Sequence, residues 1–107
     1  MERRTTPRIP LDMPYVLTLV IEGGQSLPVM LTDISIGGMK LTLPPAATGT
    51  ELINNTRVSV KDFPPQVARE LDGSTGTIVW VVRNQCGIHL DKPISCPLEL
   101  IVGANPP

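Results

Sequence analysis

The chain has 107 residues, with nine Lys and Arg, ten Asp and Glu, and a formal net charge of -1. That length suits one domain with a single core, and the near-neutral charge argues against a general nucleic-acid binder, which would carry a broad basic surface. Two cysteines are too few for a secreted disulfide scaffold, and the longest apolar stretch, 15–21, is about a third of a membrane span. We therefore expect a cytoplasmic protein with reduced cysteines and no direct membrane insertion.

A small basic segment opens the chain. Arg3, Arg4 and Arg8 all fall within the first eight residues. Pro7 and Pro10 favour extended backbone, in which Arg4 and Arg8 lie on the order of 12 Å apart. Two guanidiniums at that span can hold phosphates or purine edges in a fork geometry. The segment is predicted to be a flexible arm that clamps a small anion.

Short runs of β-branched and aliphatic residues, broken by Gly and Pro about every ten residues, predict an all-β module. The twelve prolines also indicate that the chain contains little helix. The expected strands are 15–21, 27–34, 39–43, 57–61, 78–82 and 86–90. Six short antiparallel strands with one apolar face each are most economically closed into a small barrel.

The turns and the remaining segments follow from glycine positions and hydrophobicity. Residues 22–25 are predicted to join the first two strands as a hairpin, and Gly37 and Gly38 to supply positive φ at the next reversal. We expect 62–74 to be a loop in which 66–69 can form one helical turn. Residues 98–102 are too apolar to stay in water and form either a short terminal helix or a seventh strand.

The end of the second predicted strand carries candidate binding residues. Asp33 and Ser35 share one face of the strand, while Ile34 and Ile36 are predicted to point into the core. The aspartate can accept from a guanine edge or hold an arginine, and the serine hydroxyl can contact phosphate or base. Gly38 permits close backbone approach. Taken alone, residues 33–38 are explained by an Asx or ST turn at a strand end. Taken alone, the arginines at 4 and 8 are explained as solvated charges.

The two motifs occur together, RxxxR at 4–8 and DxSxxG at 33–38, about 25 residues apart with a hairpin between them. In this order they resemble the signature of the PilZ domain, a bacterial receptor module for cyclic di-GMP. Residues 76–80 and 87–90 are similar to the late strand pair of that family, with Leu90 where an aromatic is common. The resemblance implies a six-stranded antiparallel barrel, often closed by a C-terminal helix.

The resemblance also implies a ligand site and a division of the chain. Residues 1–12 would be the ligand-clamping arm and 13–107 the barrel of the same single domain. The candidate cyclic di-GMP-binding residues are Arg3, Arg4, Arg8, Asp33, Ser35, Gly37 and Gly38, with Arg83 as an addition at a turn where a merely exposed arginine is the commoner case.

Other residues that could carry chemistry have simpler explanations. Trp80 alternates with Ile78 and Val82, which predicts a core residue rather than a base-stacking platform. One His and two Cys offer no spacing for a zinc site, and no nucleophile has a base and an orienting group. His89 falls on the polar phase of its strand. We therefore expect no metal, no cofactor and no enzymatic activity.

The predicted function is a cyclic di-GMP receptor or adaptor. Ligand binding would order the arm and present an altered surface to a partner protein in motility, biofilm or exopolysaccharide control. One ligand or two stacked ligands fit the three arginines equally. Two alternatives stay open: a PilZ-like protein-interaction module that binds no nucleotide, and an excised regulatory domain of a polysaccharide synthase. With three aromatic residues, the chain lacks the platform that single-stranded nucleic acid requires.

Overall fold

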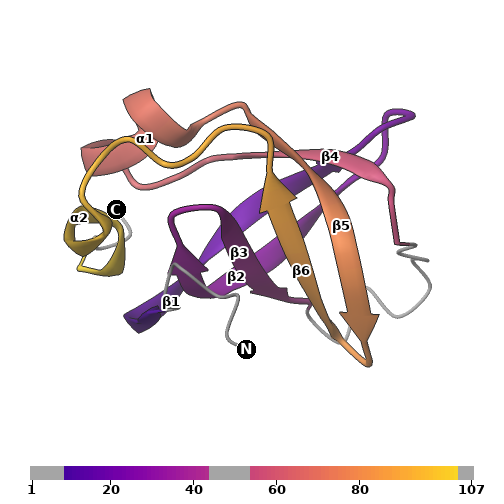
Figure 1. Cartoon of the computed structure of the whole chain (residues 1–107), viewed down its shortest axis with the longest axis horizontal. Helices are drawn as coiled ribbons and strands as arrows, with labels where there is room; N and C mark the ends of the chain where they lie inside the picture. The colour runs from indigo at the N-terminus through magenta and orange to yellow at the C-terminus, as the bar shows by residue number, and fades with distance from the viewer. Residues whose placement is uncertain (1–8, 44–53, 104–107) are drawn as a thin grey trace, which may run out of the picture.

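The computed structural model describes residues 9–43 and 54–103, which form a closed antiparallel β-barrel with two short helices (Figure 1). The strands are β1 (Ile9–Ile21), β2 (Ser26–Ser35), β3 (Gly38–Thr42), β4 (Arg57–Lys61), β5 (Ser74–Val82) and β6 (Gln85–Leu90). The helices are α1 (Pro65–Leu71) and α2 (Leu98–Val102). Around the barrel the strands are ordered β1-β2-β3-β6-β5-β4, each hydrogen-bonded to the next. The predicted six-stranded antiparallel barrel is confirmed.

Strand β1 is longer than predicted. It begins at Ile9, where Ile9 and Pro10 face Ile34 and Asp33 of β2. Residues 9–12, assigned above to the arm, are thus part of the first barrel strand. A proline is tolerated there because this half of β1 lies beyond its pairing with β4 and forms an edge. The turn after β1 has the expected positive φ at both of its glycines.

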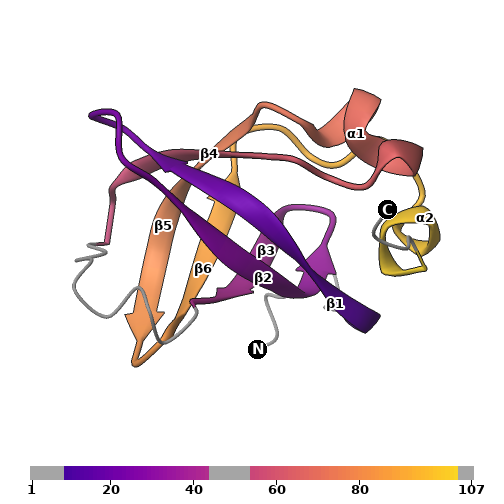
Figure 2. The same cartoon turned by 180° about the vertical axis from the view of Figure 1, so that it is seen from behind.

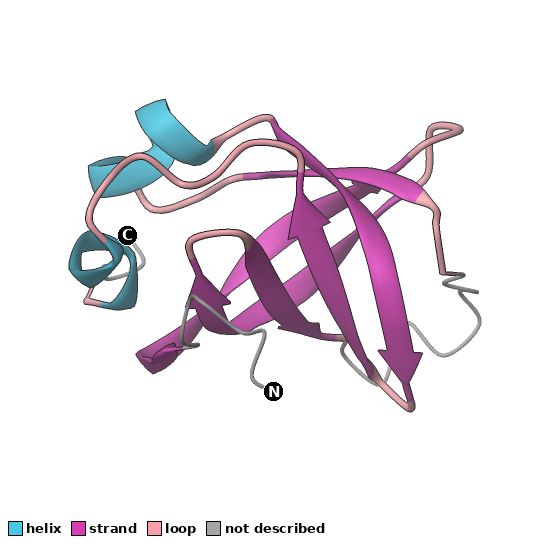
Figure 3. Cartoon of the chain, viewed as in Figure 1, coloured by secondary structure: helices cyan, strands magenta, loops and turns pink. Residues whose placement is uncertain are grey.

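The connection predicted as a loop contains α1, which is a correction. Pro65 occupies the first turn, where its fixed φ suits a helix, and Val67 and Leu71 form one buried face at a spacing of four. Residues 98–102 form a helix rather than a seventh strand, with Ile101 fully buried. Both helices lie together at one end of the barrel (Figure 3).

The barrel interior is apolar. The largest fully buried side chains of the barrel and of the two helices packed on it are Leu17, Leu19, Leu31, Ile34, Met39, Leu41, Ile78, Ile101, Val29, Val60, Val67 and Cys86. Among the described residues, no polar or charged side chain is fully buried. The Tyr15 hydroxyl donates a hydrogen bond of 3.1 Å to the Ile101 carbonyl and so ties α2 to β1. Burial, with a smaller contribution from nearby Cys96, raises the pKa of Tyr15 to about 12.

A bulge interrupts the alternation of β2. Leu31 faces Leu41 of β3, but the next paired residue is Asp33, so Thr32 is an extra residue in the strand. As a result Leu31 and Ile34, three apart, are both fully buried, and Asp33 lies outside the core. The bulge therefore decides which face of the sheet the polar residues at this end of β2 occupy.

A second bulge lies in β5 and overturns the prediction that Trp80 is a core residue. Ile78 faces Ile88 of β6, Val79 is the extra residue, and Trp80 then faces Gly87. Ile78 is fully buried, whereas Trp80 is half-buried outside the core, and Val81 packs against the core in its place. The predicted alternation fails because one residue is inserted after Ile78.

The remaining expectations concern the cysteines and membranes. Cys86 and Cys96 are not disulfide-bonded, and burial raises the pKa of the Cys86 thiol to about 11. Across residues 9–43 and 54–103, neither helix is long and apolar enough to cross a membrane.

From the opposite side, β1 and β2 cross the front of the barrel and lead toward α2 (Figure 2).

Candidate functional site

The candidate site lies on the outer face of the sheet formed by β2, β3, β6 and β5. One row of cross-strand partners runs from Asp33 to Lys40, Gly87 and Trp80. The Asp33 carboxylate lies 3.9 Å from the Lys40 ammonium group, with side chains 16% and 31% exposed. Ion pairs of this separation near a surface contribute roughly 0–1 kcal/mol. The row thus presents a carboxylate and an ammonium group beside each other without a deeply buried charge.

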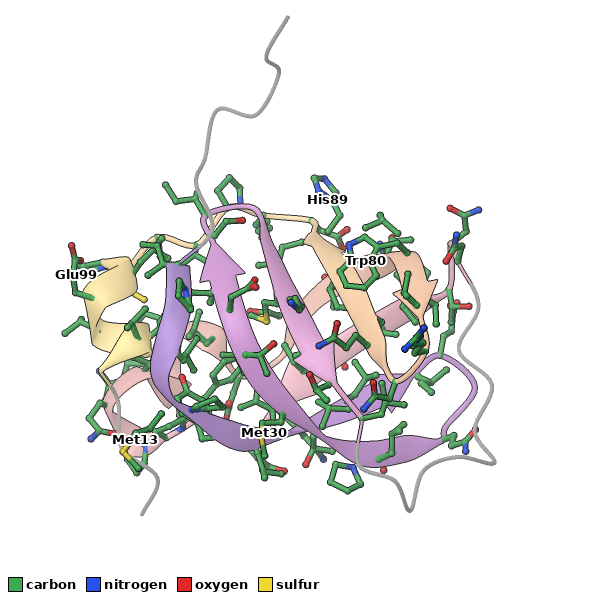
Figure 4. All side chains as sticks on the ribbon, turned by 90° about the horizontal axis from the view of Figure 1, so that it is seen from below. Met13, Met30, Trp80, His89 and Glu99 are labelled. Carbon is green, nitrogen blue, oxygen red and sulfur yellow. The ribbon has the colours of Figure 1, made fainter. Side chains whose placement is uncertain are left out.

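A second row runs parallel to the first. Ser35 faces Gly38, Gly38 faces His89, and His89 faces Thr77. His89 is exposed, and Ser35 and Thr77 are half-buried. Asp33 and Ser35 are therefore on the outer face together, as predicted from their spacing of two. Figure 4 shows His89 and Trp80 on the same side of the β5–β6 pair.

The positive φ predicted for the two glycines of the motif is wrong. The positive-φ glycines among the described residues are Gly23, Gly24 and Gly73, so neither Gly37 nor Gly38 supplies a left-handed turn. Gly38 does permit a close backbone approach, here between β3 and β6, because a Cβ there would stand 2.6 Å from the backbone oxygen of Ile88. Its close approach brings β3 against β6 and fixes the second row.

The turn after β2 is held by the last residue of β6 and by the segment that follows it. The Leu90 amide donates to the Gly37 carbonyl at 2.9 Å, and the Ile94 amide donates to the Ile36 carbonyl at 2.8 Å. Ile36 itself is 42% exposed, which corrects the prediction that it points into the core. It lies beyond the end of β2, where strand alternation no longer applies.

A charged cluster borders the second row on the far side. Arg57 donates to both carboxylate oxygens of Asp91, at 2.8 and 2.5 Å, and the Thr75 hydroxyl donates at 2.7 Å. These hydrogen bonds hold the pKa of Asp91 well below its usual range, and the hydrogen bond from Arg57 has the larger effect. Arg57 is thus engaged by Asp91 and links β4 to the segment after β6.

The arginines predicted for the site fall into two groups. Arg3, Arg4 and Arg8 lie outside the described residues. Arg83 is exposed, with a φ of 56°, in the turn between β5 and β6. That turn lies beside Thr42, at the opposite end of β3 from Gly38. The structure therefore separates Arg83 from the other described candidates (Figure 1).

The described candidate residues are half-buried or exposed on the outside of the barrel. A cleft of about 300 Å³ is present elsewhere, between the α1–β5 turn and residues 92–95, and contains none of the described candidates. Within the described ranges, no three His, Cys, Asp or Glu residues are grouped as metal ligands. Sequence reasoning missed Lys40 and Trp80 as neighbours of Asp33, because their place depends on the register across the two bulges.

A sequence model of the PilZ domain matches residues 2–102, nearly the whole chain. The chain belongs to the PilZ domain family. Binding of cyclic di-GMP is typical of PilZ domains, which form a family of binding and adaptor domains. The match includes the segment with Arg4 and Arg8 as well as the turn after β2. A comparison with curated proteins finds no match.

Proposed function

We propose that this PilZ domain binds cyclic di-GMP on the outer face of β2, β3 and β6, with the N-terminal arginines closing over the ligand. The observation that carries the proposal is where β1 begins. Ile9 and Pro10 face Ile34 and Asp33, so the chain enters the barrel directly beside the motif. Arg8 is bonded to Ile9, which keeps their Cα atoms about 3.8 Å apart.

The residue chemistry suits this ligand. Guanidiniums offer two parallel donors to a phosphate, or to O6 and N7 of guanine, which is what Arg4 and Arg8 would supply. The Asp33 carboxylate can accept from the N1 and N2 donors of a guanine, and the Ser35 hydroxyl can donate to a phosphate. Lys40, beside Asp33, adds a cation for the second phosphate.

The output of binding is a change of surface. An arm that is fixed by the ligand presents a new face next to β2 and β3, and a partner protein can recognise that face. The domain would thus act as a receptor without chemical turnover. Control of motility, biofilm or exopolysaccharide synthesis is the class of output we propose.

Isothermal titration of cyclic di-GMP tests the proposal. Wild-type protein should bind saturably, GMP should not compete, and Arg4→Ala or Arg8→Ala should each weaken binding roughly tenfold to a hundredfold through lost charged hydrogen bonds. Asp33→Ala should also weaken it. Arg69→Ala is the matched control, because this arginine is exposed on α1.

Two results would count against the proposal. One is absence of heat with folded wild-type protein, which would favour a protein-interaction module without nucleotide. The other is equal affinity of the Arg4→Ala, Arg8→Ala and Arg69→Ala variants, which would place the ligand away from the arm.

A further inference from the structure

His89 is exposed on β6, in the row of outer-face residues that begins at Ser35. Its neighbours Ile88 and Leu90 are buried, so the imidazole points away from the core. Figure 4 shows it projecting outward from the barrel. Within residues 9–43 and 54–103, no hydrogen bond or ion pair involves this imidazole. Its ring nitrogens therefore have no described partner.

Gly38 leaves an open position between His89 and Ser35. It faces His89 on one side and Ser35 on the other. The Ser35 Oγ lies 3.9 Å from the point that a Cβ on Gly38 would occupy. With neighbouring strands about 4.8 Å apart, the backbones of Ser35 and His89 are separated by roughly 10 Å. A phosphate above Gly38, with a hydrogen bond of about 2.8 Å on each side, can bridge the hydroxyl and the imidazole.

The polar neighbours of His89 on its other side are occupied by Arg57. Asp91, two residues after His89, accepts hydrogen bonds from Arg57 at both carboxylate oxygens and a third from Thr75. Thr77, which faces His89 on β5, accepts a hydrogen bond of 3.0 Å from the same guanidinium. The imidazole is thus left available on the side of the motif.

We propose that the His89 imidazole donates a hydrogen bond to a phosphate of the cyclic dinucleotide that the Ser35 hydroxyl binds from the other side of Gly38. This inference rests on the function proposed above and assigns one further contact within it. An imidazole carries at least one N–H donor whether it is neutral or protonated. Its hydrogen bond to an ionised phosphate is stronger than one between neutral groups. His89 thus brings β6, which carries neither motif, into the ligand site.

The test uses the fact that His89 is the only histidine, so its imidazole proton signals are unambiguous in the NMR spectrum of the untagged chain. Titration of wild-type protein with cyclic di-GMP at constant pH should shift these signals saturably, with the same midpoint as the calorimetric isotherm. His89→Ala should weaken binding by about threefold to thirtyfold, the loss of one hydrogen bond to a charged group.

Two further substitutions separate donation of a hydrogen bond from stacking. His89→Gln keeps an N–H donor and should bind within about threefold of wild type. His89→Phe keeps an aromatic ring without a donor and should bind as weakly as His89→Ala. Lys92→Ala, which removes an exposed cation three residues along the chain, is the control for a general charge effect and should bind as wild type.

Failure of this inference is distinguishable from failure of the proposed function. Calorimetric binding without a shift of the imidazole signals overturns the His89 contact and leaves the receptor function standing. The same holds if His89→Ala binds within about threefold of wild type, or if His89→Phe restores binding as well as His89→Gln does. Absence of any calorimetric binding by folded wild-type protein overturns both. The wild-type imidazole signals decide the matter even if a variant at position 89 does not fold.

Discussion

Gly38 sets how closely two strands approach at the motif. Its replacement by alanine would place a Cβ 2.6 Å from the Ile88 oxygen, so β3 and β6 would have to separate. We expect Gly38→Ala to lower the free energy of unfolding by about 1–3 kcal/mol, as overpacking does, measured by urea denaturation.

Gly37→Ala is the matched control. A Cβ at Gly37 would meet nothing within 4 Å, and Gly37 is not among the positive-φ glycines. Its free energy of unfolding should change by less than about 0.5 kcal/mol. Equal destabilisation by the two substitutions would contradict the close-approach role of Gly38.

At this scale the sequence predicts some residues well and others poorly. The shared face of Asp33 and Ser35 follows from a period of two, and both lie on the same side of one bulge. Trp80 is predicted wrongly because the period is broken by an inserted residue, and nothing in a run of β-branched residues marks Val79 as that residue. The prediction that Ile36 points into the core is wrong because β2 ends one residue before it, at Ser35.

Helix α2 closes one end of the barrel through a single fully buried residue. We expect Ile101→Ala to lower the free energy of unfolding by about 2–5 kcal/mol, because it removes a buried side chain and leaves a cavity. Leu100→Ala, at a neighbouring position that is 51% exposed, should change it by less than about 0.5 kcal/mol. Chemical denaturation of the two variants separates these outcomes, and a neutral Ile101→Ala would mean that α2 is dispensable to the fold.

The elements differ in how far sequence predicts them. Each of the six strands carries its own alternation and its own turn residues, so all six are found. Helix α1 is seven residues long, and its buried pair at Val67 and Leu71 is too short a pattern to establish a helical period. The early start of β1 is hidden because Pro10 and Pro14 are poor strand residues except at an edge.

Two buried groups predict how the stability of the whole molecule depends on pH. Burial raises the pKa of Cys86 from 9.0 to about 11 and that of Tyr15 from 10.0 to about 12. The unfolded chain therefore loses these protons first, and their contribution is fully present below pH 9 and is lost as pH rises toward 11 and 12.

Urea denaturation between neutral and alkaline pH measures this loss. Wild-type stability should fall across that window, and a Cys86→Ala/Tyr15→Phe double variant should show a shallower fall from a lower starting value. A wild-type stability that rises or stays constant would contradict the neutral, buried state of both groups.

For the molecule as a whole, closure of the barrel follows from sequence because six half-apolar strands leave no other economical way to cover their edges. The binding surface follows only in part. The motif predicts Asp33, Ser35 and Gly38, but the register that sets Lys40, His89 and Trp80 beside them depends on pairing between strands far apart in the chain.

The central claim is that this outer face, and no other, binds cyclic di-GMP. Amide chemical shifts recorded during a titration with the ligand test both the binding and its place. We predict the largest shifts at Asp33, Ser35, Gly38, Lys40 and His89, with none in α1 or in the turn between β1 and β2. The claim would be contradicted if the largest shifts occurred around the cleft at residues 92–95, or if no shift occurred at saturating ligand.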